Sequence, residues 1–215
     1  MPSELCLKAR PWLGIPATDY EDHMGPEGAD QLAVLNDLFR DIYNDVYPKN
    51  LLVLGCGTGN GLEHIDRTIT QRAVGIDINT RYLEIARQRY NQLSQTMEFM
   101  CLCVEECDFE PKSFDLIHAA LMFEYVDPEY ALSRIAAWLK PSGVFSFVIQ
   151  LPSSKQGIIT DTGIASMQEL EDVIQLVDPE PFLKTAARIG LEEKITWEIP
   201  LKYDKKFMAG LLIKP

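Results

Sequence analysis

Short, continuous apolar runs alternate with amphipathic segments over most of the chain. Five of the runs lie at 51–54, 73–77, 97–104, 114–121 and 144–151. Their apolar residues are contiguous rather than alternating, which is typical of strands that helices bury on both faces. Two later runs, 194–201 and 206–213, flank the polar stretch 202–205 and predict an antiparallel hairpin.

The segments between the runs carry apolar residues at helical spacing. Between Asp30 and the helix breaker Pro48, one face of the predicted helix holds Leu32, Leu35, Leu38, Phe39, Ile42 and Val46. Further helices are expected at 79–94, at 127–140 and at 166–189, the last with a break at 178–181 and with Gly190 at its end. Residues 1–28 contain Pro2, Pro11, Pro16 and Pro26 and are expected to be irregular.

The order of these elements predicts the fold class. Strands that alternate with helices indicate a doubly wound α/β fold, with a mostly parallel, Rossmann-like sheet of seven strands that ends in the antiparallel hairpin. A chain of 215 residues is long enough for one domain with a full core. We therefore expect a single domain, made of an N-terminal helical segment (1–49), a central core (50–151) and a C-terminal part with helices and the closing hairpin (152–215).

The first apolar run ends in a glycine-rich turn, "LLVLGCGTGNG", with glycine at positions 55, 57, 59 and 61. Glycine loses more conformational freedom on folding than any other residue, so this spacing needs a reason. A glycine backbone can turn sharply and bring its N–H groups close to a ligand. A turn that only packs a helix against a strand would need one glycine. Four of them favour a ligand at the carboxyl end of the first strand.

The spacing of the glycines narrows the choice of ligand. The dinucleotide fingerprint G-x-G-x-x-G requires glycine at its sixth place, where the frames that begin at Gly55 and Gly57 have Asn60 and Leu62. This argues against NAD and FAD. Asp77 ends the second strand, and a carboxylate there can accept both hydroxyls of a ribose. The alternative is a helix cap or a solvated loop acid. Together, the turn and Asp77 suit an adenosine-containing ligand without a pyrophosphate.

On these residues the sequence resembles the class I S-adenosylmethionine-dependent methyltransferases. "VLGCGTGNG" (53–61) is similar to the glycine motif of that family, and "VGIDINTRYLEIARQR" (74–89) is similar to its ribose-binding segment. The stretch 103–145 follows the family's order of third strand, fourth strand, helix and proline-glycine turn. The resemblance runs from about residue 51 to residue 150. It implies that the chain uses S-adenosylmethionine to methylate an acceptor and releases S-adenosylhomocysteine.

The resemblance also implies a role for individual residues. Gly55, Gly57 and Gly59 would pass beneath the methionine part of the cofactor, with Cys56 as a small residue beside it. Asp77 would accept hydrogen bonds from the ribose diol. The remaining positions follow the later strand ends: Ile78 on the adenine ring, Val104 and Glu105 at the adenine edge, and Ala120 and Met122, within 119–122, at the methionine moiety and the methyl group.

Two positions depart from the family's pattern. Val53 stands two residues before the first glycine, where the family usually has an acid, and the acids after the third strand are shifted to Glu105 and Glu106. An alternative on the same fold is therefore a non-catalytic protein that binds S-adenosylmethionine or a partner. A nicotinamide-dependent oxidoreductase would share the ribose acid, but it fails on the glycine spacing.

The family has no universal catalytic residue, and a general base is needed only when the acceptor carries a proton that it cannot lose unaided. The candidates are His23, in an N-terminal segment expected to form a lid over the cofactor, and Glu124 and Tyr125, which should border the acceptor pocket. His23 could instead lie at the surface or cap a helix, and Tyr125 could simply pack against the following helix. His118, inside an apolar strand, is expected to be structural.

Composition and charge restrict the partners. The chain has 20 Lys and Arg against 32 Asp and Glu, a net charge of −12, so a small-molecule acceptor is expected rather than nucleic acid. No apolar run approaches the roughly 20 residues that span a bilayer, and the polar start shows no signal peptide. The odd number of cysteines fits a reduced, cytoplasmic protein. No histidine lies near Cys101, Cys103 and Cys107, so no metal site is expected. The oligomeric state stays open.

Overall fold

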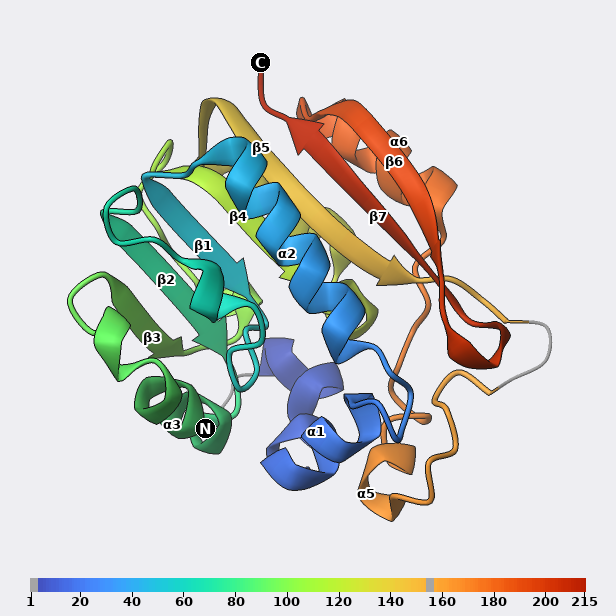
Figure 1. The fold of residues 1–215 in the computed structure, drawn as a ribbon. Coiled ribbons are helices and arrows are strands. Elements are labelled where there is room, and N and C mark those ends of the chain that lie inside the picture. The colour runs from blue at the N-terminus through green and yellow to red at the C-terminus, as the bar shows by residue number, and fades with distance from the viewer. Residues whose placement is uncertain (1–3, 154–156) are drawn as a thin grey trace.

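The sheet of the protein has seven strands in the order β3-β2-β1-β4-β5-β7-β6 (Figure 1). The computed structural model describes residues 4–153 and 157–215. The strands are β1 (Asn50–Leu54), β2 (Arg72–Asp77), β3 (Met97–Cys101), β4 (Phe114–Ala120), β5 (Leu139–Gln150), β6 (Glu192–Pro200) and β7 (Lys206–Ile213). β1 to β5 are parallel, whereas β7 runs antiparallel to both β5 and β6. The predicted fold class, a mostly parallel sheet with a C-terminal antiparallel hairpin, is confirmed.

Helices cover both faces of this sheet. They are α1 (Ala17–Met24), α2 (Leu32–Val46), α3 (Thr80–Arg89), α4 (Pro128–Trp138), α5 (Ala165–Gln168) and α6 (Pro179–Ile189). On one face, Phe39 and Tyr43 of α2 pack with Leu51 of β1 and Leu83 of α3. On the other face, α4 and α6 bury an aromatic cluster that contains Trp138, Phe145, Phe147 and Phe182. The parallel strands β1, β2, β4 and β5 are therefore buried on both faces over most of their length, which explains their continuous apolar runs, whereas the edge strand β3 is only partly buried.

The carboxyl ends of the parallel strands meet at one edge of the sheet, where α1 and α5 lie across them (Figure 1). β1 and β4 are neighbours at the centre, and the chain leaves them toward opposite sides of the sheet. Such a switch point leaves a crevice at the carboxyl ends, and ligands of doubly wound folds bind there. The turn after β1 and the turn after β4 both open onto this crevice.

The N-terminal region differs from its prediction. Residues 1–28 were expected to be irregular, but a 3₁₀ helix spans Glu4–Leu13 and α1 spans Ala17–Met24. Pro16 is the N-cap of α1, a position where a missing N–H costs no helical hydrogen bond. Pro16 therefore marks a helix boundary, and Pro11 lies inside the 3₁₀ helix.

Three other boundaries also differ. The third strand ends at Cys101 instead of residue 104, because a 3₁₀ turn follows at Val104–Glu106. β5 begins at Leu139, five residues early, since its first residue pairs with Phe114 across a β-bulge. The helix predicted at 166–189 forms only at its two ends. The expected break at 178–181 is instead the start of α6, where Asp178 accepts a hydrogen bond from the backbone N–H of Glu180 at 3.1 Å.

Candidate cofactor and acceptor site

The four glycines of the turn after β1 form two pairs with different surroundings. All four glycines have positive φ, at +68°, +53°, +94° and +92° along the chain. Gly55 and Gly57 line a cavity at the carboxyl edge of the sheet. A Cβ on Gly57 would lie 3.4 Å from the hydroxyl oxygen of Tyr20. This pair therefore exposes bare backbone to the cavity, as a close-fitting ligand requires.

Gly59 and Gly61 do not line the cavity and have a packing role. A Cβ on Gly59 would lie 2.5 Å from the ring of Tyr90, and one on Gly61 would lie 3.0 Å from the ring of Phe39. Both rings are buried. The second pair lets the turn pack tightly against α2 and the end of α3, so only Gly55 and Gly57 face the cavity.

Replacing Gly59 by alanine is expected to lower the free energy of unfolding by about 3 kcal/mol, because it adds a clash with a buried ring to the strain of positive φ. Gly190 is the matched control. It has a φ of +91°, and its added Cβ would meet nothing within 4 Å, so Gly190→Ala should cost only about 1 kcal/mol. Urea denaturation of both variants measures the difference. Equal losses would contradict the packing role of Gly59.

Asp77 joins the end of β2 to the glycine turn. Its Oδ2 accepts a hydrogen bond from the backbone N–H of Gly57 at 2.9 Å, and its Oδ1 accepts one from that of Asn79 at 2.8 Å. Burial raises the pKa of the carboxyl group. Each carboxylate oxygen has a second lone pair, so the two oxygens can still accept two hydroxyl groups side by side. This is the arrangement that a ribose diol needs.

Aromatic rings from the N-terminal segment close over this part of the cavity. Tyr20 of α1 stacks on Tyr82 of α3, with ring centroids 5.4 Å apart and an interplanar angle of 27°. Trp12 meets Tyr20 and Tyr125 edge-on, at 5.9 and 5.5 Å. Tyr82 lines the cavity, and its hydroxyl group is buried and has no hydrogen-bond partner among the described residues. A buried orphan hydroxyl is costly, so it indicates a polar ligand in this half of the cavity.

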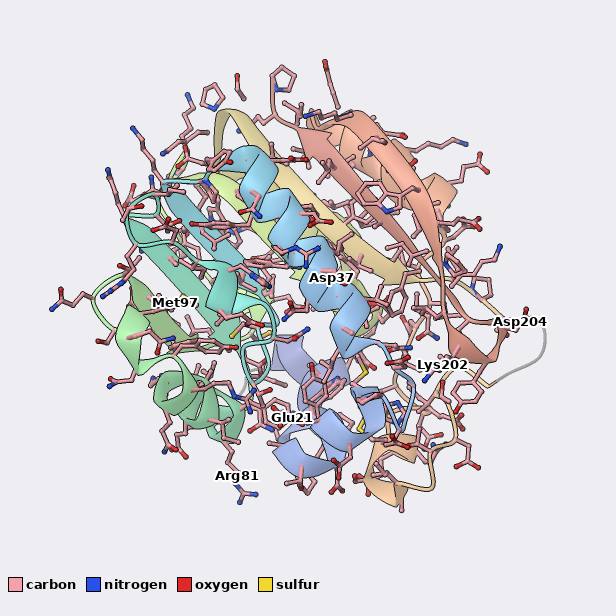
Figure 2. The ribbon with its side chains drawn as sticks, in the orientation of Figure 1. Glu21, Asp37, Arg81, Met97, Lys202 and Asp204 are labelled. Carbon is pink, nitrogen blue, oxygen red and sulfur yellow. The ribbon has the colours of Figure 1, made fainter. Side chains whose placement is uncertain are left out.

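A polar contact holds α1 against the glycine turn. Glu21, labelled on α1 in Figure 2, accepts a hydrogen bond from the Thr58 hydroxyl at 2.6 Å and lies 2.9 Å from the guanidinium of Arg89. These hydrogen bonds, with the Thr58 hydroxyl and Arg89, lower the pKa of the Glu21 carboxyl, although its burial opposes them. The carboxylate thus connects the N-terminal helix to both the turn and α3.

Glu124 marks the other half of the cavity, beyond the end of β4. It is 1% exposed, and its Oε1 accepts a hydrogen bond from the backbone N–H of Gln150 at 2.7 Å. Its Oε2 has no hydrogen-bond partner among the residues that the structure describes. Burial raises the pKa of this carboxyl from about 4.5 to about 7. The group can therefore exchange a proton near neutral pH, with one oxygen free to do so.

The other two candidates for catalysis also line the cavity. His23 lies in α1 rather than ahead of the first helix, and its Nδ1 is 2.8 Å from the hydroxyl of Thr162. Burial lowers its pKa, so the ring is neutral at pH 7. The ring of Tyr125 packs edge-on against Trp12, and burial raises the pKa of its hydroxyl. His118 lies in the core, with its Nδ1 3.0 Å from the hydroxyl of Ser146, as expected of a structural histidine.

The structure brings most of the sequence-derived positions to one cavity. Its lining includes eight of the ten expected cofactor positions: Gly55, Gly57, Asp77, Ile78, Val104, Glu105, Ala120 and Met122. Gly59 and Cys56 lie outside the lining. The Cys56 side chain is buried in the same cluster as Phe39, on the sheet face that α2 covers. Val53, where the family usually has an acid, belongs to that cluster too, so this departure falls outside the cavity lining.

Several lining residues were missed from the sequence. Trp12 belongs to no motif, Tyr82 was given no role within the segment 74–89, and Gln150 was placed only within the strand 144–151. Lys205 belongs to the polar stretch between the last two strands, which reads as a solvated turn. Only the antiparallel direction of β7 carries it to the carboxyl edge.

The cysteines differ in state. Cys56, Cys101 and Cys107 are free thiols. Cys103 is disulfide-bonded, which differs from the expectation of a reduced chain. Across residues 4–153 and 157–215, no group of three or more His, Cys, Asp or Glu side chains is placed to hold a metal ion.

Comparisons with known proteins match the central part of the chain. Residues 52–147 match the family model described as "Methyltransferase domain". The ubiquinone biosynthesis O-methyltransferase of Neisseria meningitidis is 33% identical over 120 residues, which cover 53% of this chain and 50% of that protein. The fatty-acid O-methyltransferase of Mycolicibacterium smegmatis is 28% identical over 110 residues, 50% of this chain and 39% of that protein. The chain thus spans half or less of the length of these relatives.

Solved structures share the whole fold. The N-methyltransferase NodS from Bradyrhizobium japonicum, in complex with S-adenosylhomocysteine, superposes with a TM-score of 0.70 at 16% identity and covers 99% of this chain and 100% of its own. The [4+2]-cyclase SpnF has a TM-score of 0.67 at 17% identity and covers 85% of this chain and 80% of its own. A cyclase among the neighbours shows that the fold does not fix the reaction.

The central part of the chain is thus similar to methyltransferases, in agreement with the family that its sequence resembles. Within the described residues, no helix is both long and apolar enough to cross a membrane.

Proposed function

We propose that this protein binds S-adenosylmethionine and transfers its methyl group to a small-molecule acceptor. The observation that carries the proposal is one continuous cavity that joins the Gly57–Asp77 pair to the free oxygen of Glu124. The first pair suits a ribose, and the second group suits proton transfer. A protein that only bound the cofactor would not need to bury a carboxyl oxygen without a partner at the far end of its cavity.

The residues of the first half would hold the cofactor. Asp77 would accept hydrogen bonds from the ribose hydroxyls. The backbone of Gly55 and Gly57 would lie under the methionine part. The unpaired hydroxyl of Tyr82 would donate a hydrogen bond to a polar atom of the ligand. When bound, S-adenosylmethionine supplies an electrophilic methyl group on a sulfonium. The protein's task is then to align an acceptor and to exclude water. The rings of Trp12 and Tyr20 would exclude water from the cavity.

Glu124 would act as the general base. An acceptor hydroxyl or amine beside its Oε2 would give up its proton to that oxygen as the acceptor atom takes the methyl group. Oε1 stays fixed by the backbone N–H of Gln150, which sets the direction of the free oxygen. The name of the ubiquinone biosynthesis O-methyltransferase says that this relative methylates on oxygen, which agrees with an acceptor hydroxyl that loses its proton.

Calorimetric titration of the purified protein with S-adenosylmethionine and S-adenosylhomocysteine tests the proposal first. We expect micromolar binding of both and no comparable binding of NADH, because the glycine spacing does not match the motif that binds a pyrophosphate. Failure of both adenosine ligands to bind a folded sample would overturn the proposed function.

A further inference from the structure

Lys205 is a buried cation in the acceptor half of the cavity. It follows the turn between β6 and β7, which Lys202 and Asp204 mark in Figure 2, and it is only 3% exposed. Its Nζ donates a hydrogen bond to the backbone carbonyl of Ile158 at 2.6 Å. One carbonyl satisfies one of its three donors. The remaining donors are available to a ligand in the cavity that this residue lines.

The charge of Lys205 has no ion-pair partner among the described residues. The two lysines beside it in the hairpin do have one: Lys202 lies 2.9 Å from Asp30, and Lys206 lies 2.7 Å from Glu198. Burial lowers the pKa of Lys205 to about 8, and the negative charge of Glu171 opposes this shift. The side chain is therefore still mostly charged at pH 7. A buried ammonium without a counterion is costly, and an anion in the cavity would compensate it.

Lys205 and Glu124 are tied to the same residue, Gln150. The backbone N–H of Gln150 donates to Glu124, and its side-chain amide donates at 2.7 Å to the carbonyl of Ile158, which also accepts from Lys205. The two charged groups therefore flank one side chain and face the same cavity, so a single small molecule can reach both.

The rest of this half of the cavity is mostly apolar. Its lining includes Met24, Leu35, Leu121 and Ile159, together with the polar residues Gln31 and Thr160. Among the described residues, the other basic side chain in the lining is His23, which is neutral at pH 7. One lysine balances a single negative charge, whereas a phosphate dianion would need more donors. The chemistry that fits is an apolar body with one carboxylate.

We propose that Lys205 binds a carboxylate of the methyl acceptor, so that the acceptor is a small, apolar organic acid whose hydroxyl or amine reaches Glu124. This inference rests on the proposed function, because it names the substrate class of the same cavity. Lys205 acts here as a specificity residue, since it anchors the acid at a distance from the reacting atoms.

The test uses the protein saturated with S-adenosylhomocysteine and matched pairs of probes. Hexanoate and 3-phenylpropanoate are titrated by calorimetry beside hexanamide and 3-phenylpropanamide, and 3-phenylpropyl phosphate provides the phosphate arm. We expect at least one acid to bind ten-fold or more tightly than its amide. Lys205→Met should remove that preference and leave the affinity for the amide and for S-adenosylhomocysteine unchanged. Lys206→Met, on the exposed neighbour, should change none of these.

Three results would overturn the inference: acids and amides that bind equally or not at all, an acid preference that survives Lys205→Met, or a preference for the phosphate. Because Lys205→Met removes a buried charge, the variant should stay folded; Lys205→Gln provides a second, polar replacement with the same expected loss. Failure of S-adenosylhomocysteine to bind the unmodified protein would instead count against the proposed function, so the two failures are distinguishable.

Discussion

Replacing Asp77 by asparagine is expected to weaken S-adenosylhomocysteine binding by roughly 100-fold, from the loss of charge-assisted hydrogen bonds worth about 1.5–3 kcal/mol each. The carboxylate now accepts from the backbone N–H groups of Gly57 and Asn79 and has lone pairs left for a diol. An asparagine keeps one acceptor oxygen and turns an NH₂ group toward one of these donors. The titration that measures cofactor affinity gives the result directly.

Asp115→Asn is the matched control for this variant. Asp115 lies in β4 and is held by Lys140 at 2.8 Å and by the backbone N–H of Asn50 at 2.7 Å, outside the cavity lining. Its replacement removes an ion pair near the opposite end of the sheet and should leave ligand affinity intact. If Asp77→Asn stays folded and binds as tightly as the unmodified protein, the ribose role of Asp77 is wrong.

Replacing Glu124 by glutamine is expected to slow methyl transfer by about 10²–10⁴-fold without a change in cofactor affinity, because the base is lost while the binding residues remain. In the unmodified protein, activity should rise with pH through about 7, as the Glu124 carboxyl loses its proton. The glutamine variant should lack that limb of the profile. Rates are measured with a hydroxy or amino derivative of an acid that binds in the probe panel, because the parent acids carry no group for Glu124 to deprotonate.

Stability gives a second readout for Glu124 that needs no acceptor. Its pKa is higher in the folded protein than the ordinary value of 4.5, so the folded state holds the proton more tightly. The stability from this difference is fully present below pH 4.5 and is lost as the pH rises through about 7. The melting temperature of the unmodified protein should therefore fall relative to Glu124→Gln between pH 5 and pH 8. Parallel curves for the two proteins would contradict the raised pKa.

The parallel part of the fold follows from the sequence because local and global signals agree there. Strands buried on both faces read as continuous apolar runs, and 51–54 and 73–77 lie within one residue of β1 and β2. Boundaries moved where pairing or packing overrides the local signal. Leu139 joins β5 because it pairs with Phe114 across a bulge, and α1 forms from a polar, proline-bounded segment because Tyr20 and Met24 pack onto the edge of the sheet.

The candidate site, like the fold, was only partly predictable from the sequence. The place of Gly57 and Asp77 at one cavity could be predicted from their positions after β1 and β2, because the carboxyl ends of parallel strands share one edge. The role of Gly59 could not be separated from that of Gly57, since the contact with Tyr90 depends on how α3 packs. Lys205 lies 81 residues after Glu124 in the sequence. Only the position of β7 between β5 and β6 brings the two to one cavity.

Because β7 runs antiparallel to its neighbours, the two halves of the cavity come from different parts of the chain. The proposed cofactor half is built largely from turns that follow the parallel strands, covered by rings of the N-terminal segment. The proposed acceptor contact on Lys205 comes from the connection of a hairpin that packs at the end of the sheet. A substitution in that short connection can change which acceptor binds, while the residues proposed to bind adenosine stay the same. Related proteins with different substrates are therefore expected to differ most in the stretch that corresponds to residues 201–205.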